Sequence, residues 1–306
     1  METVIRYLYR SNYYPNANTF NRLRELLGEY NNVSSENVYP FIGADNALRA
    51  IFYNLVEPGD IVEFITPTFS MIPILASLRG LNVISINSFE CGDWWCIDFE
   101  ELIGNASKAD MIVLVDPNNP TGAPILKGDR KLLLALVENT KGFIVIDETY
   151  YEFSSYTLAP MVEECPNLII VRSLSKAFCL AGFRLGYIIA HRDVVKVLSK
   201  PYTVFDIPTP SLVAGIAALE NRDYVNKIVS KIIELREWMY TELKKLGFKV
   251  YKSLTNFLLV KDMRDLRGYM LRHGILIKSV ADNLYRIGIG DEEVCKMVIK
   301  ILGELK

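Results

Sequence analysis

Three short polar segments of the sequence carry residue types that could do chemistry together. Each follows a short apolar run: residues 116–122 follow the run at 111–115, residues 147–150 follow 143–146, and residues 172–176 follow 168–171. They supply an amine, a carboxylate, a phenol, an amide and two hydroxyls, from Lys176, Asp147, Tyr150, Asn119, Ser173 and Ser175. Ligands of open α/β sheets bind where strands end, so the pattern predicts one polar site at that edge.

Each segment alone has an ordinary structural explanation. Asp147 could cap a following helix, and residues 119–122 favour a turn for backbone reasons. Residues 173–176 alone could be a loop. Because the three segments occur in order, each after a buried strand-like run, a shared site is the better interpretation.

The elements that must position these residues alternate along the chain. Helical spacing at 46–56 is followed by a strand-like run at 61–65, and a helical segment at 70–79 by a run at 81–86. The continuous apolar runs before the polar segments are typical of strands buried on both faces of a parallel sheet. We therefore predict an α/β fold, with a mostly parallel central sheet and helices on both faces.

The pattern changes after Pro208 and Pro210. Apolar residues at helical spacing extend over 224–246, and shorter strand candidates follow at 248–252, 257–260, 275–278 and 284–289. Helices are expected at about 264–273 and 291–304. This part predicts a smaller α+β domain reached through the long helix.

The composition excludes several classes of protein. The 306 residues carry a formal net charge of −2, which gives no basic stripe for nucleic acid or anionic membranes. No apolar run reaches the length of a membrane helix, and the first ten residues lack the apolar stretch of a secretory signal. We expect a cytoplasmic protein with reduced thiols at its five cysteines and no metal site.

Taken together, the motifs resemble the fold-type I pyridoxal-phosphate enzymes, and most of all the histidinol-phosphate aminotransferase group. The resemblance covers nearly the whole chain, in the family's order. The matching residues are Tyr14-Pro15, Gly43-Ala44-Asp45, Pro67-Thr68-Phe69, 118–122, 147–150, 173–178, 180–187, Pro201-Tyr202, Asn256-Phe257 and 285–287. The family's Asn-Glu-Asn-Pro-like segment has no counterpart before Tyr14, and Thr149 stands where Ala is usual.

The resemblance implies a role for each residue around pyridoxal 5′-phosphate. Lys176 would form an imine with the cofactor aldehyde and then move a proton at the substrate carbon. Asp147 would pair with the pyridine nitrogen, and Phe69 would stack on the ring. Tyr150 and Asn119 are expected at the phenolic oxygen of the cofactor, so the implied catalytic residues are Lys176, Asp147 and Tyr150.

The same resemblance assigns the phosphate and the substrate. The implied phosphate ligands are Ala44, Asp45, Ser173, Ser175 and Arg184, with Tyr14 reaching in from the other subunit of a homodimer. Arg286 would bind the anionic end of the substrate, near Asn119 and Tyr202. The implied domains are a large cofactor-binding domain at 28–220 and a small domain that combines 1–27 with 221–306.

The expected reaction is amino-group transfer from an amino donor to 2-oxoglutarate, with histidinol phosphate, in histidine biosynthesis, as the suggested donor. Three alternatives stay open. One is a lyase similar to the threonine-phosphate decarboxylases, although Ala181 stands where those enzymes tend to have Pro. Another is a general aromatic or aspartate aminotransferase, and the third is a non-catalytic cofactor-binding module.

Overall fold

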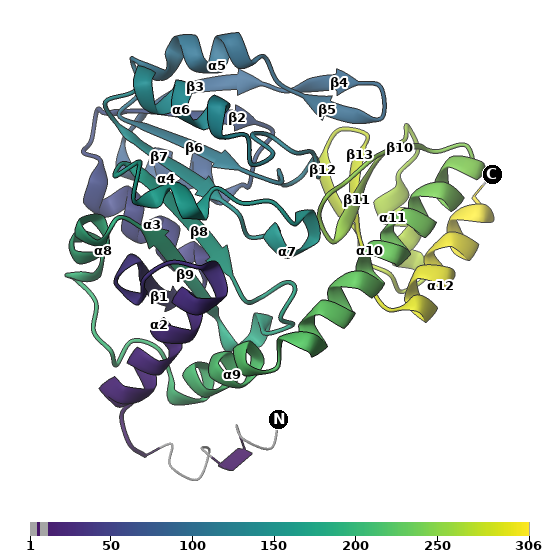
Figure 1. Ribbon diagram of the computed structural model, residues 1–306. Coiled ribbons are helices and arrows are strands. Elements are labelled where there is room, and N and C mark those ends of the chain that lie inside the picture. The colour runs from purple at the N-terminus through teal and green to yellow at the C-terminus, as the bar shows by residue number, and fades with distance from the viewer. Residues whose placement is uncertain (1–4, 7–11, 306) are drawn as a thin grey trace.

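The computed structural model describes residues 5–6 and 12–305, and its centre is a seven-stranded sheet with the order β1-β9-β8-β7-β6-β2-β3 (Figure 1). The five strands from β8 to β3 are parallel, whereas β9 and β1 are antiparallel to their neighbours. The strands are β1 (Val38–Ile42), β2 (Ile61–Thr66), β3 (Asn82–Asn87), β6 (Met111–Val115), β7 (Phe143–Asp147), β8 (Leu168–Ser173) and β9 (Leu185–Ala190). The expected mostly parallel sheet is confirmed.

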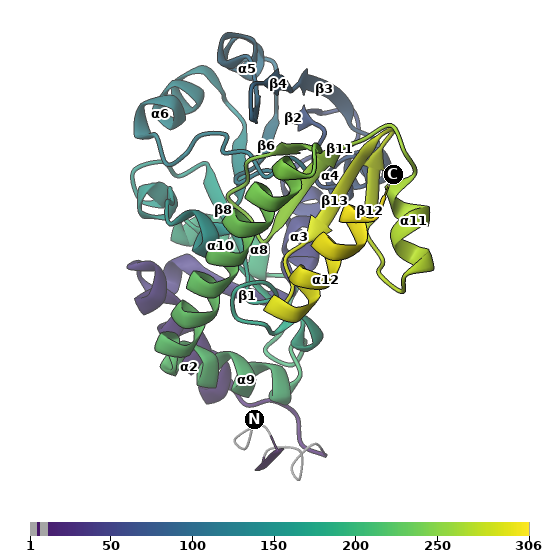
Figure 2. The same cartoon turned by 90° about the vertical axis from the view of Figure 1, so that its right-hand side faces the viewer.

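The helices cover both faces of this sheet (Figure 2). Helix α4 (Met71–Arg79) connects β2 to β3, and α6 (Arg130–Asn139) connects β6 to β7, in opposite directions along the sheet. Since such crossovers are right-handed, the two helices lie on opposite faces. Helix α3 (Ala44–Leu55) packs with α4, and α5 (Phe99–Ala106) with α6. With both faces covered, every residue of β6 and β8 is buried, which explains the continuous apolar runs at 111–115 and 168–171.

Helix α2 (Ala17–Asn31) belongs to the core of the large sheet. Its buried side chains Phe20, Leu23 and Leu27 join that core, and the helix packs against β1 and α9 (Thr209–Glu220). The sequence had placed residues up to 27 with the small domain, so α2 lies on the other side of the expected boundary. Helix α8 (Arg192–Ser199) also packs on the β1 side of the sheet.

The C-terminal part forms a second, smaller sheet with its own helices, beside the large sheet. Helix α10 (Arg222–Lys245) leads to a four-stranded antiparallel sheet with the order β10-β11-β13-β12. The remaining elements are β10 (Lys249–Tyr251), β11 (Phe257–Lys261), α11 (Leu266–Arg272), β12 (Lys278–Ala281), β13 (Leu284–Gly288) and α12 (Glu292–Gly303). These elements have their own apolar core, in agreement with the expected smaller α+β unit.

Some elements differ from expectation. Strands β1 and β9 were not predicted, and β12 begins at Lys278, where the predicted strand ended. A short hairpin of β4 (Phe89–Cys91) and β5 (Trp94–Cys96) was also missed. A disulfide joins Cys91 to Cys96, so the expectation of reduced thiols is wrong for this pair. The two residues are diagonal to each other in the hairpin, with Cα atoms 5.9 Å apart. None of the helices in the described residues is long and apolar enough to cross a membrane.

Candidate active site

A cavity of about 270 Å³ lies where β6, β7 and β8 end, and the small sheet contributes to its wall. All three polar segments contribute to it. Its lining consists of Ala44, Asp45, Phe69, Val115, Asn119, Asp147, Thr149, Tyr150, Ser173, Ser175, Lys176, Ala181, Arg184, Lys278 and Arg286. The structure therefore brings together every candidate residue from the sequence except Tyr14 and Tyr202.

The carboxylate of Asp147 is at the inner wall of this cavity. Only 4% of the residue is exposed, and the backbone N–H of Thr149 donates to Oδ1 at 3.0 Å. The Thr149 hydroxyl donates to the same oxygen. Burial raises the pKa of Asp147 to about 6, although both Thr149 bonds oppose the rise by stabilising the ionised form. A cation placed beside Asp147 would bring this carboxylate to full ionisation.

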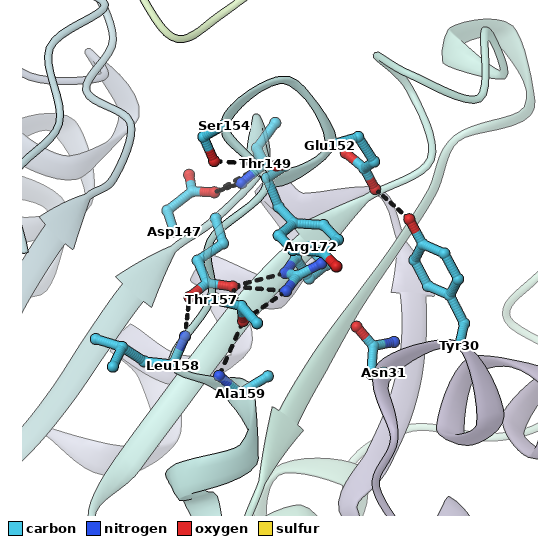
Figure 3. A network of polar contacts seen from close by, with 12 residues as sticks. Tyr30, Asn31, Asp147, Thr149, Glu152, Ser154, Thr157, Leu158, Ala159 and Arg172 are labelled. Atoms are coloured by element: carbon cyan, nitrogen blue, oxygen red, sulfur yellow. Dashed lines mark hydrogen bonds and ion pairs between the residues drawn. The ribbon is translucent and has the colours of Figure 1, made fainter. Parts of the chain in front are cut away.

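A buried ion pair fixes the strand ends that carry Asp147 and Ser173 (Figure 3). Arg172, next to Ser173, donates from Nε to Glu148, next to Asp147, at 2.8 Å, and neither side chain is more than 3% exposed. Glu148 also accepts hydrogen bonds from the Thr157 hydroxyl and the Leu158 N–H. Because Arg172 is on β8 and Glu148 follows β7, the pair sets the lateral spacing of the two strands at the cavity.

The amine of Lys176 is at the end of the segment that follows β8. Burial, and secondarily the nearby Arg286 guanidinium, lower the pKa of this amine, while Asp147 opposes the change. Its Nζ lies 5.8 Å from the centre of the Tyr150 ring. The phenol of Tyr150 is buried, which raises its pKa to about 12 and keeps it protonated at neutral pH. The site thus combines an amine that loses its proton more easily than usual with a phenol that retains its own.

Another wall of the cavity is suited to an anion. Ala44 and Asp45 form the first turn of α3, where backbone N–H groups lack partners within the helix. The guanidinium of Arg184 lies beside this turn, 3.3 Å from Asp45. Gly43 has φ +79° and a Cβ there would come within 2.6 Å of the Arg184 guanidinium, so glycine makes room for it. Ser173 and Ser175 contribute hydroxyls to the same cavity.

The small sheet contributes two cations. Arg286 of β13 donates from Nη1 to Oδ1 of Asn119 at 2.7 Å, and its guanidinium lies over the Phe257 ring. Lys278 of β12 pairs with Arg286 in the strand register and also lines the cavity. Sequence reasoning missed Lys278, together with Val115 and Ala181, and had noted Thr149 only as a departure. The one available signal for Lys278 was a cation near the start of a strand that precedes Arg286.

Two candidate residues lie elsewhere. Tyr14 is 83% exposed, and its ring lies beside that of Phe205, with ring centres 5.4 Å apart. Tyr202 packs edge-on against Phe41, with ring centres 5.0 Å apart. Asp116 is also outside the cavity: its carboxylate accepts backbone N–H groups of Ile125 and Leu126, which orders the loop after β6. Among the described residues, no three His, Cys, Asp or Glu side chains are grouped so as to hold a metal ion.

Comparison with known proteins gives a consistent result. Residues 10–302 match the model of the family described as aminotransferase class I and II. A histidinol-phosphate aminotransferase of Sulfurisphaera tokodaii is 48% identical over 305 residues, covering 100% of this chain and 85% of the relative. One of Caldanaerobacter subterraneus is 31% identical, with coverages of 96% and 84%.

Solved structures agree with the fold. The histidinol-phosphate aminotransferase of Clostridium acetobutylicum is 22% identical and superposes with a TM-score of 0.87, covering 99% of this chain and 94% of the other. The enzyme of the same name from Sinorhizobium meliloti, in complex with pyridoxal-5′-phosphate, is 25% identical with a TM-score of 0.86 and coverages of 99% and 85%.

Proposed function

The chain belongs to the aminotransferase class I and II family, and we propose that it moves an amino group from histidinol phosphate to 2-oxoglutarate. The enzyme class and the cofactor, pyridoxal 5′-phosphate, follow from the family. The donor is supported by the names of the relatives and by one observation on the site. Two cations from the small sheet, Arg286 and Lys278, line the same cavity as Lys176.

The residues of the cavity fit the cofactor. The first turn of α3, Ser173, Ser175 and Arg184 offer donors and a fixed positive charge for its phosphate. The buried carboxylate of Asp147 offers an acceptor for its ring nitrogen. When bound, the cofactor supplies an aldehyde that an amine can attack and a ring that stabilises negative charge.

Lys176 performs the covalent attachment and the proton transfer. Because burial lowers its pKa, a larger share of its amine is unprotonated at neutral pH than for an exposed lysine. Lys176 would hold the cofactor through Nζ, since the unprotonated amine is the form that reacts with an aldehyde. The same Nζ would hold and move the proton at the substrate carbon that bears the amino group. Asp147 would hold the ring nitrogen, and its ionised carboxylate would favour release of that proton.

The two small-sheet cations bind the anionic ends of both substrates. Histidinol phosphate has a phosphate and no α-carboxylate, whereas 2-oxoglutarate has two carboxylates. Both must be bound in turn in one cavity. The planar donors of Arg286 suit phosphate and carboxylate oxygens alike, and Lys278 adds a second positive charge.

Further parts of this proposal concern assembly and place. The active unit is a homodimer in which the exposed Tyr14 reaches the phosphate site of the partner subunit. The two domains are a cofactor-binding domain, to which we now assign α2, and a small domain that begins with α10. In this proposal the protein acts in the cytoplasm.

A panel of amino donors tests the reaction. Purified protein with cofactor is mixed with histidinol phosphate, histidinol, aspartate, tyrosine or phenylalanine, and loss of the absorbance of lysine-bound cofactor is followed in single half-reactions. Histidinol phosphate should react well above the others, and Lys176→Ala should lack that absorbance. Preference for a common amino acid, with no reaction on histidinol phosphate, would leave a general aminotransferase. Release of carbon dioxide from threonine phosphate would point instead to the lyase.

A further inference from the structure

The β4–β5 hairpin connects the large sheet to the small one. It follows β3 and extends toward β10 and β13, as Figure 1 shows. Its strands pair from Phe89 with Cys96 to Cys91 with Trp94, and the Cys91–Cys96 disulfide closes the tip. None of its residues lines the cavity.

Glu90 of the hairpin binds two lysines of the small sheet. Its carboxylate pairs with Lys249 of β10 and with Lys261 of β11, the latter at 2.6 Å. These hydrogen-bonded lysines lower the pKa of Glu90 to about 2, so the carboxylate is charged throughout the neutral range. One side chain thus holds both strands at this edge of the small sheet.

Asp93, inside the loop that the disulfide closes, binds the long helix. Its carboxylate accepts hydrogen bonds from the Tyr240 hydroxyl at 2.7 Å and from Lys244 Nζ at 3.0 Å, both on α10. Its backbone carbonyl accepts the N–H of Lys252 at 2.7 Å, just after β10. Three residues therefore bind Asp93, whose loop the disulfide restrains.

An aromatic contact completes the junction. The ring of Trp95 meets that of Tyr251 edge-on, with centres 5.6 Å apart, and Tyr251 is fully buried. The hairpin therefore covers apolar surface of β10 as well as pairing with its charges. Such a contact is less sensitive to salt than the exposed ion pairs around it.

The paired strands of the small sheet connect the hairpin to the cavity. Strand β10 pairs with β11, β11 with β13, and β13 with β12, so the hairpin binds one edge of a sheet whose other strands carry Arg286 and Lys278. The cofactor-facing residues Lys176 and Asp147 are on the large sheet instead. A change at the hairpin should shift the two cations relative to the cofactor residues.

We propose that the β4–β5 hairpin is a positioning element for substrate binding, and that its disulfide makes the affinity for anionic substrates sensitive to thiols. Intact, the hairpin holds the small sheet where Arg286 and Lys278 reach the substrate. Reduction by a dithiol such as dithiothreitol breaks the S–S bond: the reagent gives two electrons and two protons, two cysteine thiols form, and the reagent closes into its cyclic disulfide. This inference rests on the proposed substrate roles of Arg286 and Lys278.

The first test removes the charges of the hairpin. In Glu90→Gln/Asp93→Asn, KM for both the amino donor and the 2-oxo acid should rise roughly threefold to tenfold, the range that a few exposed ion pairs supply. The absorbance of lysine-bound cofactor and the affinity for the cofactor should stay unchanged. Glu164→Gln is the control, because it removes an exposed ion pair with Arg130 at 2.9 Å within the large domain. Unchanged KM, or an equal loss of cofactor affinity, would overturn the positioning role.

The second test concerns the disulfide. Dithiothreitol should raise KM in the wild type, whereas Cys91→Ser/Cys96→Ser should have the raised KM already and not respond. Alkylation and mass measurement confirm that the bond has opened. The double variant also controls for reactions at the free thiols of Cys165, Cys179 and Cys295, because it retains all three. A wild type that is fully reduced but has unchanged KM would refute the thiol sensitivity.

Arg286→Lys, measured in parallel, separates this inference from the proposed function. If Arg286→Lys leaves KM unchanged, the substrate role of the small sheet is wrong. If Arg286→Lys raises KM and the hairpin variants do not, only the hairpin inference fails.

Discussion

Arg286 and Asn119 are joined by a hydrogen bond of 2.7 Å from Nη1 to Oδ1, which links the small sheet to the loop after β6. They are 167 residues apart in sequence. The bond occupies one guanidinium N–H and leaves others for an anion. It also restrains the amide of Asn119. One contact thus joins the residue that we propose for the substrate to one that we propose for the cofactor.

Arg286→Lys should weaken both half-reactions, because lysine retains the charge but loses the planar set of donors. Each lost charge-assisted hydrogen bond should cost roughly 1.5–3 kcal/mol in transition-state stabilisation. The measurement is kcat/KM for donor and 2-oxo acid separately. Asn119→Ala is the companion variant: it removes the partner and leaves the guanidinium. If Arg286→Lys behaves as wild type in both half-reactions, the guanidinium does not bind substrate.

Asp147→Asn should change how the stability of the cofactor-free protein depends on pH. Burial raises the pKa of Asp147 to about 6, so the folded protein keeps a proton that the unfolded chain releases. This contribution to the free energy of unfolding is fully present below about pH 4 and is lost as the pH rises through about 6, a difference on the order of 2–3 kcal/mol. The variant lacks this loss, so above pH 6 it should gain stability relative to the wild type.

Urea unfolding of both cofactor-free proteins between pH 4 and pH 7.5 measures the effect. Other buried carboxyls, such as Glu152, are common to both proteins and cancel in the difference. In the holoenzyme the gain should disappear, because the ring nitrogen stabilises the ionised carboxylate. The half-reaction of the Asp147→Asn holoenzyme with an amino donor should be slower than that of the wild type by a factor on the order of 10²–10⁴. A pH-independent difference between the cofactor-free proteins would show that Asp147 is ionised without its partner.

The cofactor end of this site could be predicted from the sequence, whereas the substrate end could be predicted only in part. Asp147 and Lys176 follow continuous apolar runs, and parallel strands of one sheet necessarily end at the same edge. Lys278 lies opposite Arg286 in the hairpin of β12 and β13, whose register a bulge between Ser279 and Ala281 shifts, and the sequence pattern does not indicate that bulge. The domain bounds came from the resemblance alone, and only the structure shows that Phe20, Leu23 and Leu27 of α2 pack in the core of the large sheet.

Lys278→Met should discriminate between donors. Methionine keeps the length of the side chain and removes the charge, so binding of a phosphorylated donor should weaken by roughly tenfold or more, as expected for one charge-assisted bond. Histidinol, which lacks the phosphate, should be much less affected. Half-reactions with both donors measure the ratio. Equal losses for the two donors would mean that Lys278 acts on something other than the phosphate.

Tyr14 provides the sharpest test of a shared active site. It is 83% exposed on its own chain and does not line that chain's cavity, although the resemblance assigns it to a cofactor phosphate. If Tyr14 serves the partner's cavity, each active site takes Lys176 from one chain and Tyr14 from the other. Tyr14→Ala and Lys176→Ala then remove groups that different chains contribute to one site. Mixing the two variants and allowing subunits to exchange should then restore activity, because one of the two sites in each hybrid dimer receives an intact Lys176 and an intact Tyr14.

The two arrangements predict opposite results for that mixture. With Tyr14 acting on its own chain, every site of the hybrid would contain one defect, and activity would not rise above the sum of the separate variants. With Tyr14 acting across the interface, one site combines both defects and the other has none, so about half the wild-type activity per hybrid dimer should return. Size-exclusion chromatography confirms that the variants remain dimers. Tyr14→Phe, which keeps the ring and loses the hydroxyl, then separates contact with Phe205 from hydrogen bonding to the phosphate.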